Sequence, residues 1–243
     1  YDFRIVNCPT RAMTGHNFSG HNFDWKHAPK EYGAIHFHDD DVDDARWEVD
    51  FEWTVPEGQP SAFYVAKLTT RDGDEDYIPF WVVPEVGKAT SKIAVMVPTI
   101  SYMAYANEHL ANNAGGAELL VYRVPIMQDQ NMFLSEHREY GGSIYDTHTD
   151  GSGLCLSSRL RPILSIRPKY DHFLMQAPWQ YPADLHLICW LETMGYDYDV
   201  ITDEDVHYNG LALLEQYNVL ITGSHPEHNT GPQLDALHNY TAG

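Results

Sequence analysis

Two segments of the sequence place oxygen and nitrogen donors directly after apolar runs. The run "KIAVMVP" (residues 92–98) leads into a segment that contains Tyr102, Tyr105, Asn107, Glu108 and His109. The run "NVLITG" (218–223) leads into "SHPEH", which contains His225, Glu227 and His228. In open parallel sheets, ligands bind outside the carboxyl ends of the strands. If both runs are parallel strands, the two groups of donors are expected to face one another.

Tyrosine, glutamate and histidine together suit a hard cation of high charge. Phenolate and carboxylate are hard anionic oxygen donors, and two tyrosinates with one carboxylate would balance the three charges of ferric iron. A free tyrosine has a pKa of about 10, so only a strong Lewis acid keeps it ionised near neutral pH. The alternative is ordinary packing, because the chain has 16 tyrosines and chance pairs are common.

The elements that must position these donors belong to an α/β domain over residues 87–243. "KIAVMVP" and "NVLITG" are continuous apolar runs, typical of strands covered on both faces. "PADLHLICWLETMG" has helical spacing and ends at Gly195, "YDYDVIT" is a short strand, and "NGLALLEQY" and "GPQLDALHNYTAG" are helices. Alternating strands and helices predict a doubly wound parallel sheet.

The sequence of residues 1–86 predicts a β-rich, sandwich-like module, which would be the last part of a larger N-terminal region. "WEVDFEWTV" (47–55) alternates apolar and acidic residues, which predicts a strand with one covered face. "AFYVAKLTT" and "YIPFWVV" follow as strands, separated by the turn "RDGDED".

More than 80 residues separate the strand that ends at Pro98 from the helix near Pro182. Connections in compact domains are usually about 4–6 residues long, and long ones tend to be functional or disordered. This connection is rich in aromatic residues, arginine and glycine, so we expect it to be ordered and to build the site. It contains "YGGSIYDTHTDGSG", whose glycines allow tight turns and close backbone approach.

Composition and charge indicate which partners and which compartment the protein is suited to. A formal net charge of −20 disfavours nucleic acid and anionic membranes as partners. No apolar run approaches the roughly 20 residues that span a bilayer, and the three scattered cysteines, Cys8, Cys155 and Cys189, fit the reducing cytoplasm. The absent initiator methionine and the end at "NYTAG" indicate an internal piece of a longer polypeptide.

Three other signals leave alternatives open. His36 and His38 with Asp39–Asp41 suggest a metal site, but a calcium loop would need Gly and Glu where Asp44 and Asp50 stand, so a solvated acidic loop is favoured. "SSRLRPILSIRPKY" supplies either an anion clamp or, as favoured here, cations that pair with acidic groups or fix the insertion against the sheet. His148 and Asp150 either polarise a group near Tyr145 or form a local turn.

Several motifs resemble one family. "PTISYMAYANE", "YGGSIYDTHTDGSGLCLSSRLRPILSIRPKY" and "VLITGSHPEH" look like the large (beta) subunit of N,N-dimethylformamidase and its relatives. "TRAMTGHNFSG", "YGAIHFHDDD" and "WEVDFEWTVPEG" look like the preceding region of that subunit. The similarity covers nearly the whole chain in order. It implies a class I glutamine amidotransferase-like α/β fold, although no cysteine stands at a nucleophile elbow.

The resemblance also implies an activity and its residues. It implies an amidohydrolase with a mononuclear ferric iron held by Tyr105, Tyr145 and Glu227, with His225 holding a substrate oxygen or assisting proton transfer. Tyr102 is the rival of Tyr105, since two phenols stand three residues apart. The substrate would be a small amide like N,N-dimethylformamide, hydrolysed to an amine and a carboxylic acid.

The same resemblance implies partners and leaves one alternative function. A small subunit and self-association would complete a hetero-oligomer, and an acidic residue that serves as catalytic base would lie beyond residue 243. The alternative is a non-catalytic module that binds carbohydrate or a partner subunit on the same scaffold. A tyrosinate–iron centre would be coloured, whereas a binding module would be colourless.

Overall fold

The computed structural model describes residues 11–14, 17–24, 27–36, 40–109, 122, 124–149 and 151–242. Cys8, His38, Asp39 and Asp150, as well as the first ten residues of the predicted 1–86 module, lie outside this part, and of His36 only the backbone is described. The strands are β1 Arg11–Thr14, β2 Tyr32–His36, β3 Ala62–Thr69, β4 Glu75–Val82, β5 Ile93–Val97, β6 Asp171–His172, β7 Ala177–Pro178, β8 Asp199–Thr202 and β9 Val219–Thr222. The α-helices are α1 Thr99–Ala104, α3 Asp129–Glu136, α4 Tyr181–Met194, α5 Asp203–Asn209, α6 Leu211–Leu214 and α7 Gly231–Ala242. Short 3₁₀ turns span Pro29–Glu31 and Arg138–Tyr140.

A three-stranded parallel sheet forms the centre of the described chain, in the order β8-β5-β9. β5 pairs with β8 on one side, with Val97 opposite Thr202, and with β9 on the other, with Met96 opposite Thr222. The chain therefore runs from β5 to a strand on one side and then crosses to a strand on the other. Ligands bind at such a topological switch point, outside the carboxyl ends of the strands.

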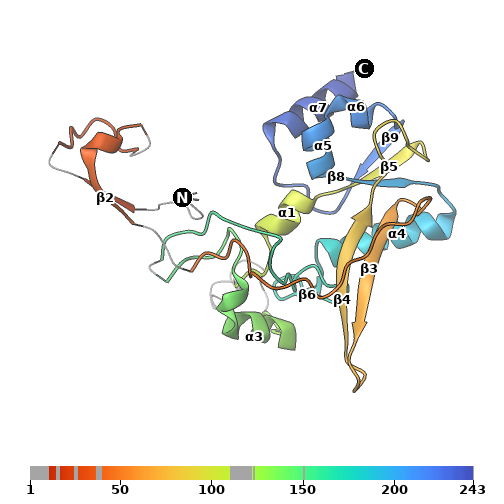
Figure 1. The fold of residues 1–243 in the computed structure, drawn as a ribbon, viewed down its shortest axis with the longest axis horizontal. Helices are drawn as coiled ribbons and strands as arrows, with labels where there is room; N and C mark the ends of the chain where they lie inside the picture. Colours follow the sequence, from red (N-terminus) through yellow and green to blue (C-terminus); the bar gives the residue numbers. More distant parts are fainter. Residues whose placement is uncertain are drawn as a thin grey trace.

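Side chains of the central strand point alternately into two apolar clusters, as the two-residue period of a strand requires. Ala94 and Met96 pack with residues of α5, α6 and α7. Val97 packs on the opposite face with Tyr181 of α4. The crossover helices thus cover opposite faces (Figure 1). Three strands do not distinguish the amidotransferase-like class from other doubly wound folds, so that assignment stays a prediction.

In the described part of residues 1–86, the strands form two antiparallel hairpins. β1 pairs with β2, and in Figure 1 this hairpin lies at the left of the view, away from the parallel sheet. β3 pairs with β4 through eight residue pairs, and its Phe63 and Trp81 pack into the same apolar cluster as Val97 and Tyr181. Ser61 joins the two sheets, because its Oγ accepts the N–H of Val200 at 2.7 Å. The second hairpin therefore helps to cover one face of the parallel sheet.

The prediction of a strand over the alternating segment 47–55 is wrong. These residues have no regular secondary structure, and the apolar side chains are exposed, Trp47 to 66%. Trp53 contacts Phe80 of β4 with ring centroids 5.4 Å apart, yet the segment joins no ladder in the described part of the chain. Alternation gives a segment one apolar face, but a strand forms only where a neighbouring backbone accepts its hydrogen bonds.

The other predicted strands and helices are confirmed with boundaries shifted by a few residues. α4 ends at Gly195, which has the left-handed φ of 72° that glycine adopts at helix ends. The short helices α1, α3 and α5 did not stand out in the sequence. α5 has a clear N-terminal signal in hindsight, because Thr202 and Asp205 form a reciprocal capping box. Among the described residues, no helix has the length and apolar character needed to cross a bilayer.

Gly223, directly after β9, lies where α4 and the start of α1 approach the backbone most closely. A Cβ at this position would collide with the Asp184 carboxylate and lie 2.6 Å from Pro98 Cδ. We expect Gly223→Ala to lower the free energy of unfolding by about 1–3 kcal/mol, the usual effect of overpacking. Chemical denaturation measures this change.

Gly231 provides the matched control. It is the first residue of α7, and a Cβ there would meet nothing within 4 Å. Gly231→Ala should leave the free energy of unfolding unchanged or raise it slightly. Equal stability of the Gly223 and Gly231 variants would contradict the close approach at Gly223.

Candidate functional site

Two tyrosines, one glutamate and two histidines converge at the carboxyl ends of β5 and β9. The hydroxyls of Tyr105 and Tyr145 both donate to Oε2 of Glu227, at 2.5 and 3.0 Å. The two phenol rings stack with centroids 4.4 Å apart and an interplanar angle of 19°. His225 Nε2 lies 3.0 Å from the same Glu227 oxygen, and His228 Nε2 lies 3.0 Å from the Tyr145 hydroxyl. We refer to these five side chains as the phenol–carboxylate cluster.

Helix α1 places Tyr105 in the cluster. The helix follows β5 directly, and Tyr105 is its C-terminal cap. Asp203, at the start of α5, satisfies the first turn of α1, since its Oδ2 accepts the N–H of Ile100 at 3.1 Å and its Oδ1 accepts the hydroxyl of Thr99 at 2.6 Å. A helix of only six residues is marginal alone, so these tertiary contacts are what hold it.

Ser101 of α1 anchors the loop that carries Glu227. Its hydroxyl oxygen is fully buried and accepts the N–H groups of Glu227 and His228, each at 3.0 Å. The carbonyl of Ser101 in turn accepts the N–H of Tyr105 at 3.1 Å. One residue therefore supports both the carboxylate and the first phenol of the cluster.

We expect Ser101→Ala to destabilise the protein. The variant leaves two backbone N–H groups of the Glu227 loop without their acceptor, and each buried unsatisfied donor costs about 1–3 kcal/mol. The free energy of unfolding, measured by chemical denaturation, should fall accordingly. Thr241→Ala is the control, because the Thr241 hydroxyl bonds carbonyls on the exposed surface of α7. A Ser101 variant as stable as the Thr241 variant would contradict the anchoring role.

Tyr145 reaches the cluster from the long connection between β5 and α4. It sits in a tight turn in which the N–H of Asp146 donates to the carbonyl of Ser143 at 3.1 Å. The N–H of Ile144 donates to the carbonyl of Ala104 at 2.9 Å, which ties this turn to the end of α1. This segment of the long connection is ordered and reaches Glu227, as predicted, and its part in a functional site stays a prediction.

The protonation states of the cluster are set by burial and by its own hydrogen bonds. Burial, followed by the hydrogen bond to Glu227, raises the pKa of Tyr105 far above its ordinary value, and burial also raises the pKa of Tyr145. The hydrogen bond from Tyr105 is the main cause that lowers the pKa of Glu227. Without a cation, the cluster is therefore one carboxylate with two neutral phenol donors.

The donor set matches the requirements of a hard cation. The hydroxyls of Tyr105 and Tyr145 each lie within hydrogen-bond distance of one carboxylate oxygen, so a single ion that replaced their two protons would meet three oxygens. Glu227 is 45% exposed at its side chain, which leaves the cluster open to ions from solvent. Among the described residues, no three His, Cys, Asp or Glu side chains gather as metal ligands by themselves.

Trp179 forms an aromatic wall beside the cluster and was not identified from the sequence. Its indole lies 4.7 Å from the ring of His225 and 6.0 Å, edge to face, from that of Tyr105. The ring limits the positions that His225 can take. Trp179 lies two residues before α4 and far along the sequence from Tyr105 and His225. Only the folding of the long connection back to the sheet therefore brings it to the cluster.

Tyr102, the rival of Tyr105, points elsewhere. Its side chain is fully buried, and its hydroxyl donates to the buried carboxylate of Asp184 in α4. Asp184 Oδ1 also accepts the N–H of Ser224 at 2.5 Å. Tyr102 and Asp184 therefore hold α1, α4 and the end of β9 together, and Tyr105 is the phenol that contacts Glu227.

Three further polar residues after α1 have structural partners away from the cluster. The amide of Asn107 donates to the carbonyl of Pro162 at 2.7 Å. Glu108 is buried, which raises its pKa to about 8, and it accepts the hydroxyl of Tyr170 at 3.0 Å. The N–H of His109 donates to Asp146 at 2.9 Å. The sequence grouped these side chains with Tyr105, but the structure does not bring them to Glu227.

The basic stretch 157–170 is occupied by internal partners, so the favoured alternative to an anion clamp is confirmed. Arg159 pairs with Glu204, and Arg167 pairs with Asp76 at 3.0 Å. Arg161 is buried and donates to the carbonyls of Tyr140 and Ala106. These contacts fix the connection against the sheet and the β3–β4 hairpin.

His148 also has a partner outside the cluster. Its Nδ1 lies 2.5 Å from Asp40 Oδ1, and its carbonyl accepts the N–H of Gly151 at 2.9 Å in a local turn. The side chain is fully buried. His148 therefore attaches this turn to the acidic segment near residue 40, as a structural contact.

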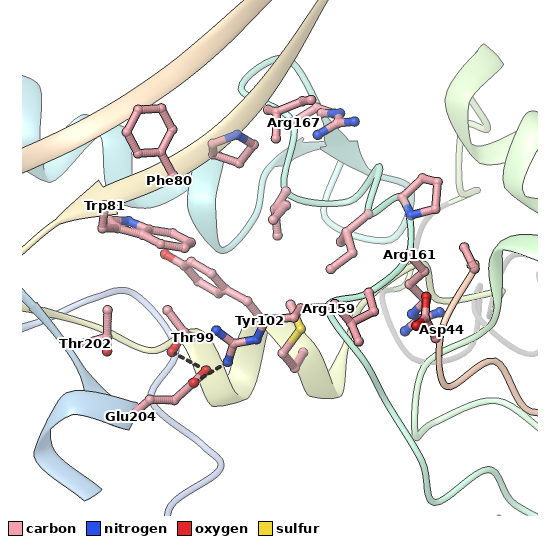
Figure 2. A pocket seen from close by; sticks show the side chains of 18 of the residues that line it. Asp44, Phe80, Trp81, Thr99, Tyr102, Arg159, Arg161, Arg167, Thr202 and Glu204 are labelled. Atoms are coloured by element: carbon pink, nitrogen blue, oxygen red, sulfur yellow. Dashed lines mark hydrogen bonds and ion pairs between the residues drawn. The ribbon is translucent and has the colours of Figure 1, made fainter. Parts of the chain in front are cut away.

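A cavity of about 630 Å³ lies on another side of α1. It is lined mostly by apolar residues of β4 and of the segment 160–166, with Tyr102 and Met103 of α1. Figure 2 shows Arg159 and Thr99 bonded to Glu204 at its side, and Tyr102 extending toward Trp81. None of the cluster residues lines this cavity, so the donors lie apart from it.

Sequence reasoning missed the residues that position the cluster. The segments that carry the cluster are contacted by four residues, of which only two left a local signal: Ser101, Asp146, Trp179 and Asp184. Ser101 stands four residues before Tyr105, on the same side of a helix. Asp146 stands three residues after Ser143, a spacing common in turns.

The sequence is similar to that of known proteins over nearly its whole length. Residues 10–243 match the family described as N,N-dimethylformamidase beta subunit-like, C-terminal. The N,N-dimethylformamidase beta subunits of Paracoccus aminophilus and of an Alcaligenes species are 46% and 45% identical to this chain over 240 residues. These alignments cover 98% of this chain but 31% of each relative. The chain thus spans under a third of the length of these curated relatives.

Proposed function

This chain belongs to the N,N-dimethylformamidase beta subunit-like family, and we propose that it carries the metal centre of an amidohydrolase that cleaves small N-substituted amides. The products would be an amine and a carboxylic acid. The metal would be one ferric ion held by Tyr105, Tyr145 and Glu227. The observation that supports this proposal is the convergence of both phenol hydroxyls on one Glu227 oxygen.

Ferric iron is the ion that these residues fit best. When bound, it would supply Lewis acidity, which polarises an amide carbonyl and acidifies water. Burial raises the pKa of both phenols, so their ionisation requires a strong positive charge nearby. The two tyrosinates and the carboxylate would balance a trivalent ion, whereas a divalent ion would leave one excess negative charge.

The residues around the three oxygens have roles in binding and proton transfer. His225 Nε2, 3.0 Å from Glu227 and 3.5 Å from the Tyr105 hydroxyl, is within reach of a substrate oxygen beside them and can hold or pass a proton. Trp179 would keep the His225 ring in place and exclude water on that side. His228 would stabilise the ionised Tyr145 by donating to its oxygen.

The partners and location are also part of the proposal. The relatives are named as beta subunits, which supports a hetero-oligomer with a further subunit and self-association. A catalytic base outside the described residues would complete the site. Cys189 is an exposed free thiol, which supports the reducing cytoplasm as the compartment.

The test is metal analysis of the intact polypeptide, followed by an assay of amine release over a panel of small amides. We expect about one iron per chain, a visible charge-transfer band from the tyrosinates, and amine release from N,N-dimethylformamide or a close analogue. An iron-free, colourless protein would contradict the proposal and favour a non-catalytic module that binds carbohydrate or a partner subunit. Iron with a band but release from other amides only would change the substrate and keep the centre.

A further inference from the structure

Other parts of the chain must hold the phenols of Tyr105 and Tyr145 at a fixed distance from each other. Tyr105 and Tyr145 stand on separate segments, yet their rings stack at 4.4 Å. Metal–ligand distances vary by only about 0.2 Å in good sites, and sites perform poorly when their supporting residues leave them about 1 Å too loose. The contacts that join the two segments therefore bear on how well they can share an ion.

One backbone hydrogen bond joins the segments immediately before the two tyrosines. The N–H of Ile144 donates to the carbonyl of Ala104 at 2.9 Å. A single bond fixes one point and still allows the Tyr145 turn to rotate about it. A second attachment is needed to set the relative orientation of the phenols.

Asp146 provides that second attachment. Asp146 is 8% exposed, and its carboxylate accepts the N–H of His109, at 2.9 Å to Oδ1 and 3.0 Å to Oδ2. Oδ2 also accepts the N–H and the hydroxyl of Ser143, at 2.8 and 3.0 Å. The Ser143 hydroxyl oxygen in turn accepts the N–H of Tyr145 at 3.1 Å. One carboxylate thus connects the segment after Tyr105 with the turn that carries Tyr145.

Gly142 shows how closely the backbone approaches this carboxylate. A Cβ at Gly142 would lie 2.9 Å from Asp146 Oδ2 and 3.2 Å from His109 Nδ1. A real Cβ essentially never comes within 3.0 Å of such an atom, so the turn lies directly against the Asp146 carboxylate. The attachment is therefore tight on both sides.

We propose that Asp146 is a positioning residue that sets the spacing of the Tyr105 and Tyr145 phenols by joining the end of the α1 segment to the Tyr145 turn. This inference rests on the proposed function, but it concerns a residue outside the ligand set. Asp146 would act through the backbones of its neighbours, without touching substrate or metal.

The chemistry of the contacts explains why a carboxylate stands at this position. The backbone N–H groups of His109 and Ser143 and the Ser143 hydroxyl all donate to Asp146, and a carboxylate is acceptor-only at both oxygens. His109 Nδ1 also lies 3.4 Å from Oδ2. An asparagine would keep one acceptor and turn an NH₂ group toward a backbone N–H, so it should preserve the attachment in part. An alanine would remove the contacts to both His109 and Ser143 and leave buried donors without acceptors.

The first experiment measures phenol spacing without metal. Photo-oxidation of the metal-free, full-length protein should cross-link Tyr105 to Tyr145, because the stacked rings are close enough to couple, and peptide mass spectrometry quantifies the product. We expect the yield to fall several-fold in Asp146→Ala and by a smaller factor in Asp146→Asn. If Asp146→Ala does not fold, Ser143→Ala, which breaks the link from Asp146 to the N–H of Tyr145, takes its place.

Asp199→Asn is the matched control. Asp199 is fully buried and accepts the N–H groups of Thr90 and Ser91 at 2.7 and 3.2 Å. It begins β8, at the edge of the sheet away from the phenols. The control carries the same change of charge and a similar loss of acceptors, so it should lower stability and leave the cross-link yield unchanged.

The second experiment measures the iron-loaded protein. We expect Asp146→Ala to bind iron about 10- to 100-fold more weakly, the usual cost of losing an outer partner of a metal ligand. The visible band per bound iron should shift, and Asp146→Asn should lie between the alanine variant and the unaltered protein. A purely structural role would lower stability without moving the band per iron.

The outcomes separate this inference from the proposed function. Cross-link yields in both Asp146 variants equal to that of Asp199→Asn would overturn the positioning role, whatever the iron content. An unaltered protein that binds no iron, combined with a reduced cross-link yield in Asp146→Asn, would overturn the proposed function and support the positioning role.

Discussion

Replacing Glu227 with glutamine should abolish high-affinity iron binding and the visible band. Glutamine has the size of glutamate and can still accept the hydroxyl of Tyr105, but it removes the negative charge that lies next to both phenols. We expect metal affinity to fall by more than the roughly 10- to 100-fold that follows loss of an outer partner, and amide hydrolysis to fall with it. Iron content and absorbance of the purified variant measure the effect.

A charge-matched control is needed because the protein carries a formal net charge of −20, which attracts cations non-specifically. Glu215→Gln makes the same change of charge at an exposed position beyond α6. That variant should keep both iron and colour. Iron bound equally by the two variants would show that Glu227 is not a ligand.

Tyr105→Phe and Tyr102→Phe should have opposite effects. Tyr105→Phe removes the hydroxyl that donates to Glu227 and keeps the ring that stacks on Tyr145, so we expect the loss of the visible band with a small change in stability. Tyr102→Phe removes the buried hydroxyl that Asp184 accepts. It should cost about 1–3 kcal/mol, the penalty for a buried unsatisfied polar group, and keep the band.

Absorbance per chain and chemical denaturation, measured on both variants, decide whether Tyr105 or Tyr102 is the ligand. Tyr145→Phe should behave as Tyr105→Phe does, because both hydroxyls donate to the same Glu227 oxygen. A colourless Tyr102 variant together with a coloured Tyr105 variant would reverse the assignment of the ligand.

The local sequence pattern was sufficient to predict the strands and helices whose own residues mark their burial or their ends. The apolar runs 93–97 and 219–222 are strands, and Gly195 ends α4, because burial and helix termination leave their mark on neighbouring residues. The parallel pairing of β5 and β9 then brings their carboxyl ends to one edge. The convergence of Tyr105 and Glu227 follows from that edge, and the family motifs pointed to Tyr145 as the second phenol.

Tertiary structure alone decided which polar side chains point where. Tyr102 and Tyr105 stand three residues apart, and no local rule separates them. The carboxylate of Asp184 accepts the Tyr102 hydroxyl in the core, and Glu227 accepts the Tyr105 hydroxyl in the loop after β9. The alternating segment 47–55 shows the same limit, because strand formation depends on a backbone partner that alternation cannot specify. Contacts between distant segments are set by packing, which is why the roles of Trp179 and Asp184 could not be predicted from the local sequence.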